Sequence, residues 1–178
     1  MQIGIVSSAY LGRYGIKDGA KKMKAHGYSA VDFQDLVNTE TEFFKLNEKD
    51  FENALKEQKN IVEGEGLWFS QAHGPWRWPV QDYEIADREE RLVSMQKAVR
   101  GTSYLGSKNF VIHPIMPFGL DCLDKAKEMR EINAESFSIN FVATLKTSAL
   151  TFALKICRFY TCQFLRLKVL SVLLKKWG

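Results

Sequence analysis

Two histidines stand in similar sequence surroundings and could do chemistry together. His73 and His113 each follow a short apolar stretch, and each precedes a proline within two residues. Neutral imidazole binds zinc or manganese, and it also forms hydrogen bonds with hydroxyl groups. Either chemistry needs both rings to face one space, so the elements that precede them decide whether they meet.

The run Phe110–Ile112 predicts a strand that is buried on both faces, as in a parallel sheet. Pro114 cannot extend a central strand, so this strand must end at His113. The stretch Leu67–Gln71 predicts another strand ahead of His73. Because α/β folds build their sites at the carboxyl ends of parallel strands, we expect both histidines to line one mouth. The alternative for each is a structural histidine at a strand end.

The rest of the chain alternates strands and helices. Further strands are expected over Gln2–Ser7 and Ser29–Phe33, and helices over Ile16–His26, from Asn47 to about Gly64, over Asp82–Tyr104 and over Asp121–Ala134. This order predicts an α/β fold with a parallel sheet and right-handed crossovers. The chain has no glycine-rich phosphate-binding loop. A complete eight-unit barrel needs about 200 residues or more, so 178 residues with four such units make about half of one.

Details within the helices can also be predicted. Gly27 is placed to end the first long helix, and Asn47 to begin the next as its N-cap. In the helix over Asp82–Tyr104 we expect a buried stripe of Ile85, Leu92, Met95 and Val99, and a solvated face at residues 87–91.

Composition and charge narrow the class of protein. The chain has no secretory leader pattern and three cysteines, which favours a reducing cytoplasm. Residues 1–135 carry a net charge of −3, whereas residues 136–178 carry seven basic and no acidic residues. We predict a domain over 1–135 and a basic, apolar, helical tail over 136–178.

The tail allows several interpretations. The abrupt loss of acidic residues together with proline favours out-of-frame sequence after about Glu135. A membrane-surface helix and a partner-binding or nucleic-acid contact are the alternatives. Charged residues interrupt every apolar stretch, so no transmembrane helix is expected.

The segments Gly27–Phe33, Gln71–Trp76 and Val111–Pro114, with a strand at the N-terminus, resemble the xylose-isomerase-like TIM barrels. The likeness is to their sugar phosphate isomerase/epimerase members, with endonuclease IV-like nucleases as cousins, and it covers residues 1–135. It implies the N-terminal half of a (βα)8 TIM barrel, with four βα units. It also implies metal-assisted proton transfer on a sugar, with Mn²⁺, Mg²⁺ or Zn²⁺ as cofactor, and a sugar substrate.

The resemblance also implies site residues. His73 and His113 are candidate metal ligands or substrate contacts. Trp76, Gln34 and Tyr10 are candidate substrate contacts, and packing is the alternative for Trp76 and Tyr10. No catalytic residue is assigned. A homo-oligomer is a further expectation, and no specific nucleic acid is expected as a partner.

The sequence departs from the family at its carboxylates. Family members carry the main metal-binding carboxylate after the fifth strand, but no Asp or Glu follows Glu135 here. Asp32 and Asp35 are the remaining carboxylates near the predicted mouth. We therefore expect little or no catalysis from this chain. The alternatives are a zinc phosphodiesterase acting on abasic DNA and a non-catalytic protein; the acidic N-terminal part speaks against the nuclease.

Overall fold

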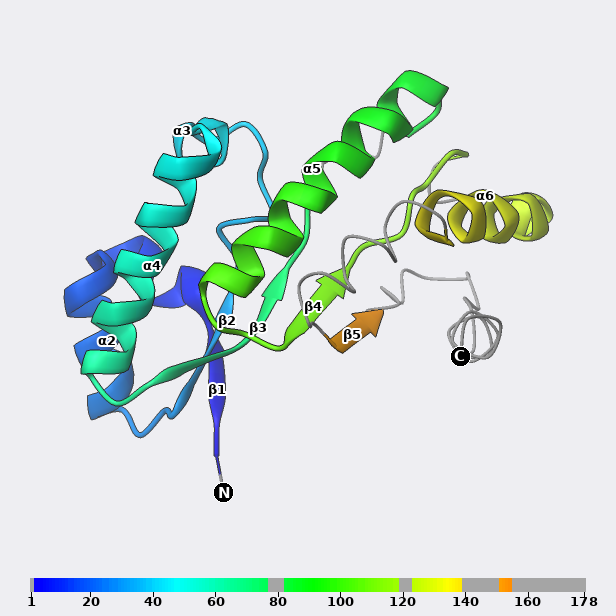
Figure 1. Ribbon diagram of the computed structural model, residues 1–178. Helices are drawn as coiled ribbons and strands as arrows, with labels where there is room; N and C mark the ends of the chain where they lie inside the picture. The colour runs from blue at the N-terminus through cyan, green and yellow to red at the C-terminus, as the bar shows by residue number, and fades with distance from the viewer. Residues whose placement is uncertain (1, 77–81, 119–122, 139–150, 155–178) are drawn as a thin grey trace.

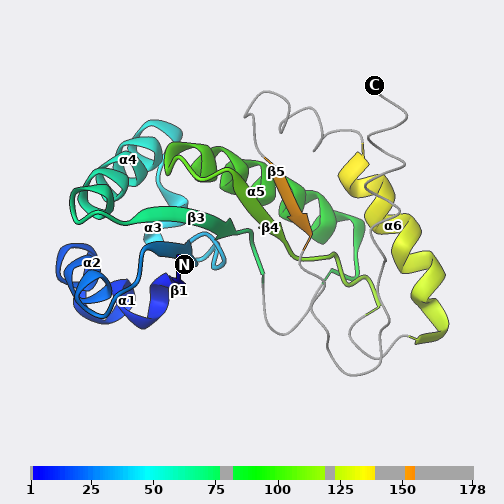
Figure 2. The same cartoon turned by 90° about the horizontal axis from the view of Figure 1, so that it is seen from below.

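A computed structural model describes residues 2–76, 82–118, 123–138 and 151–154. The strands form one parallel sheet in the order β1-β2-β3-β4-β5, so each strand pairs with its neighbour in sequence (Figure 1). Helices α2, α4 and α5 follow one another along one face of this sheet (Figure 2). This is the α/β arrangement of a partial TIM barrel, as the sequence predicts.

The bounds of the elements are close to those expected. The strands are β1 Gly4–Val6, β2 Ala30–Phe33, β3 Trp68–His73, β4 Asn109–Ile112 and β5 Thr151–Leu154. The helices are α1 Leu11–Tyr14, α2 Ile16–Ala25, α3 Glu42–Lys45, α4 Glu48–Gly64, α5 Ile85–Tyr104 and α6 Ala126–Ser138, with 3₁₀ turns at Ser7–Ala9 and Leu123–Lys125. Helices α1 and α3 are short and were not expected. β3 runs on to His73, two residues beyond its expected end.

The core lies between the sheet and its helices. Residues that alternate along each strand point to opposite faces, so one set meets the helices and the other does not. The largest fully buried side chains of the helix face are Phe33, Phe51, Phe110, Met23, Leu55 and Met95. Phe33 and Phe69 of neighbouring strands meet edge to face, with ring centroids 5.5 Å apart. The opposite face of the sheet carries the polar residues described below.

Two helix ends confirm the predicted caps. The Asn47 side chain accepts a hydrogen bond from the Asp50 backbone N–H at 3.0 Å, which satisfies a donor in the first turn of α4. Gly27 follows α2 with φ of 84°, a conformation that favours glycine.

Helix α5 differs from its prediction in three respects. It begins at Ile85 rather than Asp82, and Ile85 is 70% exposed instead of buried, because the first turn extends beyond the sheet (Figure 1). Arg91, expected on a solvated face, is only 4% exposed. Its guanidinium donates hydrogen bonds to buried oxygen atoms, which the charge pattern alone does not predict.

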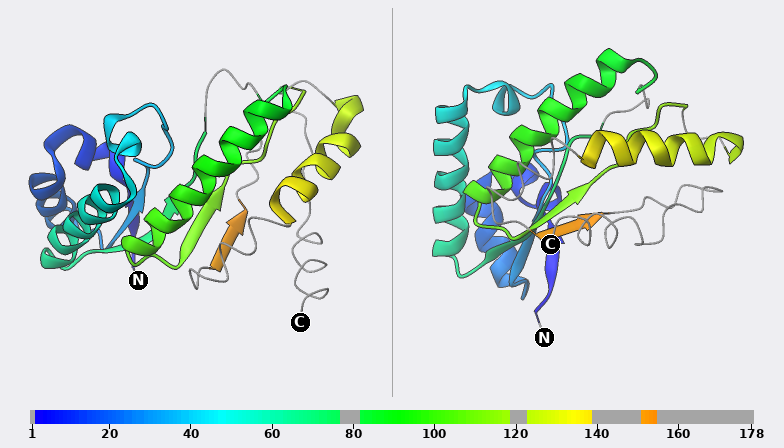
Figure 3. Two further views of the ribbon diagram at one scale, coloured as in Figure 1. Left: turned by 45° about the horizontal axis from the view of Figure 1, so that its top comes forward. Right: turned by 45° about the vertical axis from the view of Figure 1, so that its right-hand side comes forward.

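The tail lies largely outside the described residues. Its described strand, β5, pairs in parallel with β4 (Figure 3), so a strand stands at Thr151–Leu154 where helix was expected. The other predictions for residues 139–150 and 155–178 lie outside the described residues. In the described part of the chain, no helix combines the length and apolar character that a bilayer crossing needs.

Candidate site at the carboxyl ends of the strands

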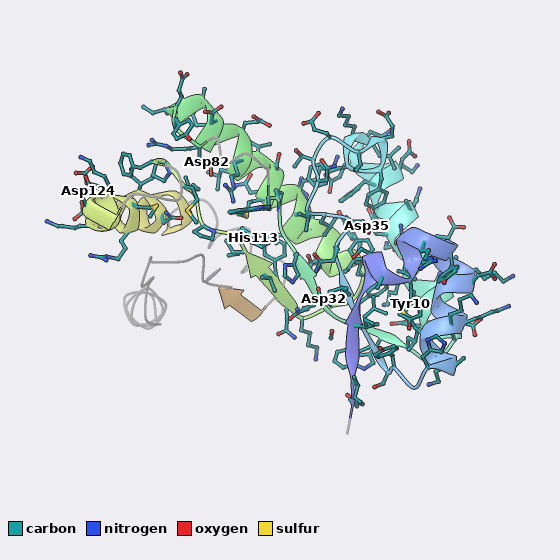
Figure 4. All side chains as sticks on the ribbon, turned by 180° about the vertical axis from the view of Figure 1, so that it is seen from behind. Tyr10, Asp32, Asp35, Asp82, His113 and Asp124 are labelled. Carbon is teal, nitrogen blue, oxygen red and sulfur yellow. The ribbon has the colours of Figure 1, made fainter. Side chains whose placement is uncertain are left out.

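Three strands bring Asp32, His73 and His113 together (Figure 4). Asp32 lies near the end of β2, His73 ends β3, and His113 directly follows β4. Parallel pairing places the carboxyl ends of these strands at one edge of the sheet, which is the reason for the meeting. The sequence predicts that both histidines line one mouth, and the structure places their rings side by side at this edge.

Asp32 is held by polar neighbours on three sides. Its Oδ2 lies 3.2 Å from His73 Nε2 and accepts a hydrogen bond from Gln71 Nε2 at 2.9 Å. Its Oδ1 accepts from Gln34 Nε2 at 3.0 Å. Burial acts to raise the pKa of Asp32, but the hydrogen bonds from His73 and Gln71 outweigh it and lower the pKa below its ordinary value. Asp32 therefore stays a carboxylate at neutral pH.

The two histidines continue this network. His73 Nδ1 lies 3.4 Å from His113 Nε2, and the ring centroids are 5.5 Å apart. With Asp32 accepting from His73 Nε2–H, neutral His73 has its lone pair on Nδ1, and His113 Nε2–H donates to it. The carboxylate thereby orders the tautomer of both rings.

Trp76 lies beside the second histidine. The indole and the His113 ring have centroids 5.2 Å apart, and the Trp76 backbone N–H donates to the Val37 carbonyl at 2.9 Å. His73 and His113 are only 2% and 7% exposed, whereas Asp32, Gln34, Gln71 and Trp76 are half-buried. The half-buried side chains are therefore more accessible to solvent than the two imidazoles.

The end of β1 joins the site through Ser7. This serine is fully buried, and its Oγ accepts a hydrogen bond from the Gln34 backbone N–H at 2.9 Å. This bond fixes the backbone at Gln34, whose side chain donates to Asp32.

Two residues near the predicted mouth do not join this network. The Tyr10 hydroxyl lies 2.6 Å from His26 Nδ1, at the end of α2, and its ring packs against Tyr28. Asp35 is exposed, two residues beyond β2. We therefore leave Tyr10 and Asp35 out of the candidate site.

The sequence pattern did not identify Gln71 or Ser7 as contributors to the site, and it placed Asp32 near the mouth without identifying its partner. The bonds of Gln71 and Ser7, and the pairing of Asp32 with His73, depend on the register between strands. One signal was present, because Asp32 stands between Val31 and Phe33 in an otherwise buried strand. A charged residue at that position must point away from the helices.

The residues present do not complete a metal site. Within the described ranges, no group of three or more His, Cys, Asp or Glu side chains could hold a metal ion. His73 Nδ1 and His113 Nε2 supply two nitrogens, and the nearby carboxylate of Asp32 is already bound to the other nitrogen of His73.

Comparisons with known proteins show the fold. No protein-family model matches the chain, and no curated protein matches it. Among solved structures, a sugar phosphate isomerase/epimerase from Parabacteroides distasonis is 17% identical with a TM-score of 0.54. The match covers 85% of this chain and 49% of that one.

Two further structures agree with this match. A putative xylose isomerase from Rhodospirillum rubrum gives a TM-score of 0.65 at 14% identity, over 86% of this chain and 53% of that one. A D-allulose 3-epimerase from Methylomonas sp. gives 0.60 at 12% identity, over 99% and 59%. The chain spans about half the length of these structures. It therefore has the fold of the xylose-isomerase-like TIM barrels, and it corresponds to about one half of such a barrel.

Proposed function

We propose that this chain is the N-terminal half of a sugar or sugar-phosphate isomerase/epimerase-type barrel, and that it binds a carbohydrate at the ends of β2, β3 and β4. The observation that carries the proposal is the network joining Asp32, His73 and His113 beside Trp76. Solved structures with this fold support the proposal, because several of them are named as sugar isomerases or epimerases.

The half-buried residues suit a polyhydroxylated ligand. Asp32 accepts hydrogen bonds, whereas Gln34 and Gln71 both donate and accept them. The indole of Trp76 offers an apolar face for the C–H side of a sugar ring. In this proposal the ligand lies on Trp76 with its hydroxyls on Asp32 and Gln71, and His113 lies directly beneath.

A divalent ion remains a proposed cofactor of the complete barrel. The separation of 3.4 Å between His73 Nδ1 and His113 Nε2 is close to that of two nitrogens bound at about 2.0–2.1 Å to one tetrahedral zinc ion. Asp32 would orient His73 from behind, as second-shell carboxylates do. The described residues provide two ligands rather than three, so further ligands would be needed to hold the ion.

We propose that the chain alone has little or no isomerase activity. Proton transfer between adjacent carbons needs a base placed against the sugar. β5 has the sequence Thr-Phe-Ala-Leu, and no Asp or Glu follows Glu135. The base and the remaining ligands would have to come from another segment or subunit, so a homo-oligomer is part of this proposal. Robust metal-dependent sugar turnover by the chain alone would contradict it.

The division into a domain over 1–135 and an out-of-frame tail also stays a proposal, as does a cytoplasmic location. Sequencing the encoding DNA over codons 125–178 tests the division. A second frame with acidic residues, glycine and proline would support it. If no frame restores such sequence, the basic tail is genuine, and partner binding through it becomes the better hypothesis.

Calorimetric titration tests carbohydrate binding directly. The ligands are D-fructose, D-allulose and their phosphate esters, with glycerol as a control. We expect Trp76→Ala to weaken binding by about tenfold, which corresponds to the loss of one stacked aromatic contact of roughly 1.4 kcal/mol. Trp68→Ala is the matched control, because Trp68 lies at the other end of β3 and is 43% exposed. Equal effects of the two substitutions, or binding of an abasic DNA duplex in place of the sugars, would contradict the proposal.

A further inference from the structure

We propose that Arg91 and Asp82 are positioning residues of the site, because their buried ion pair holds the loops after β3 and β4 so that Trp76 lies against His113. The inference rests on the proposed function only in treating Trp76 and His113 as parts of a carbohydrate site. The positioning itself follows from the contacts of the two charged side chains, and it can be tested without any ligand.

The pair is deeply buried. Asp82 is fully buried and Arg91 is 4% exposed, and Arg91 Nη1 donates to Asp82 Oδ2. Asp82 precedes α5 and Arg91 lies in its second turn (Figure 4 labels Asp82). A buried charge is costly unless it is paired and hydrogen-bonded, so an ion pair in this position calls for an explanation.

Arg91 binds both loops at once. Its Nη2 donates to the carbonyl oxygens of Pro75 at 3.4 Å, His113 at 3.2 Å and Pro114 at 3.1 Å. Pro75 lies in the loop after β3, and the other two lie in the loop after β4. Proline removes a backbone donor and ends the strand pairing, so carbonyls in these loops need other donors. One guanidinium meets that need for both loops.

Asp82 also binds the loop after β4. Its Oδ2 accepts a hydrogen bond from the Met116 backbone N–H at 3.0 Å. The ion pair therefore contacts the segment after β4 on either side of Ile115. Asn133 of α6 adds to this by accepting from the Ile115 N–H at 2.8 Å.

The consequence for the site is the placement of Trp76 between Arg91 and His113. The Arg91 guanidinium carbon lies 5.7 Å from the centroid of the indole, and the His113 ring lies 5.2 Å from it. Trp76 is thus in contact with a fixed cation and with the imidazole that the same cation helps to place through the His113 carbonyl.

Arginine is specifically suited to this role. Its planar fork directs several N–H groups in fixed directions, whereas a lysine ammonium is a compact charge on a flexible stem. Arg91→Lys keeps the charge beside Asp82 but cannot donate to three carbonyls and a carboxylate in the same geometry. This substitution therefore separates positioning from simple charge pairing.

The test is an NMR measurement on the full chain, with Arg100→Lys as the control on the same helix. The chain has three histidines, so the His113 ring signals can be assigned with single His→Gln variants. In the wild type, the indole gives the His113 ring protons a ring-current shift that Trp76→Ala removes. We expect Arg91→Lys to lose at least half of that shift, whereas Arg100→Lys keeps it, because Arg100 pairs with Glu48 on the surface.

Asp82→Asn and the wild type provide further readouts in case Arg91→Lys does not fold. Asp82→Asn keeps an oxygen for the Met116 N–H but removes the charge, and it should also reduce the ring-current shift. In the wild type, the Arg91 guanidinium protons should be resolved and protected from exchange. Folded variants with an unchanged His113 shift, or a freely rotating Arg91 guanidinium, would overturn the proposal. Sugar titration of the same samples tests the proposed function separately, since positioning can be intact while no sugar binds.

Discussion

The two faces of the sheet are built from alternate residues of the same strands, yet they differ in almost every property. Phe33 is fully buried against aromatic and aliphatic neighbours on the helix face. Asp32, its neighbour in β2, faces the other way and is bound by Gln71 and His73. Trp68, on this second face of β3, is 43% exposed.

This difference separates stability from chemistry. Apolar burial on the helix face supplies the free energy of folding, and it is insensitive to charge and pH. The opposite face carries ionisable and hydrogen-bonding groups whose arrangement depends on strand register. Substitutions on the first face should therefore change stability, and those on the second should change the site. The following predictions test how sharply the two faces divide.

The largest loss of stability is expected on the helix face. Phe33→Ala should lower the free energy of unfolding by about 3–5 kcal/mol, because it leaves a cavity in the core. Trp68→Ala, on the other face, should lower it by about 1 kcal/mol or less, since the side chain is half in water already. Urea denaturation of both variants measures the difference. Equal losses would show that the second face is also a packed core.

The buried ion pair belongs to α5 and the segment before it rather than to the polar face of the sheet, and its loss should have the next largest effect. Asp82→Asn leaves Arg91 buried without its counter-charge and should cost about 3 kcal/mol. Asp18→Asn, at an exposed position in the first turn of α2, should change stability by about 0.5 kcal/mol or less. Thermal unfolding compares the two. If Asp82→Asn is as stable as Asp18→Asn, the ion pair is not a structural element of the loops.

Gly74 directly follows β3 and lies beside the Phe110 ring of the helix face. A Cβ on Gly74 would stand 2.6 Å from the Phe110 ring, which is itself fully buried. Gly74→Ala should therefore destabilise the chain by about 1–3 kcal/mol and displace the loop that carries Trp76. Gly12→Ala is the control, because nothing lies within 4 Å of its added Cβ. An unchanged midpoint of denaturation for Gly74→Ala would show that Phe110 can move away at little cost.

The smallest effect is expected at the surface pair between α4 and α5. The hydrogen bond from Arg100, at 2.8 Å from Nε to Oε1, lowers the pKa of Glu48 below its ordinary value, against a smaller effect of burial. A carboxyl whose folded pKa is depressed stabilises the fold above its unfolded pKa, and loses this contribution as pH falls through the folded pKa. Both side chains are exposed to solvent, so the gain should be under about 1 kcal/mol.

Comparison of unfolding at pH 7 and pH 3 in the wild type and Glu48→Gln measures this contribution. The wild type should lose slightly more stability than the variant over that range. A larger loss in the variant would mean that the sign of the pKa shift is wrong.

The sequence predicts the fold better than the site because different physical signals govern them. Apolar runs, prolines and glycines specify strands and helix ends locally. The caps at Asn47 and Gly27, and the end of β4 within one residue of His113, were all predicted from such signals. The meeting of His73 and His113 follows from parallel pairing alone.

What could not be predicted depends on contacts between distant segments. The charge pattern placed Arg91 in solvent, yet carbonyls 16 to 23 residues away provide its partners. Ile85 has the helical spacing of a core residue, but the first turn of α5 extends past the sheet that would cover it. Gln71 has no local signal, since its bond to Asp32 depends on the register shift between β2 and β3.

An NMR titration of the full chain with D-allulose and D-fructose, following the three imidazole groups, tests directly whether a sugar binds at the ends of these strands. His26 is an internal control, because it is exposed and bonds to Tyr10 at the end of α2, away from the cluster. We expect saturable shifts of the His73 and His113 signals with sugar, which Trp76→Ala weakens, and an unchanged His26 signal. No shift up to high sugar concentration, or equal shifts of all three histidines, would contradict a carbohydrate site at the ends of β2, β3 and β4.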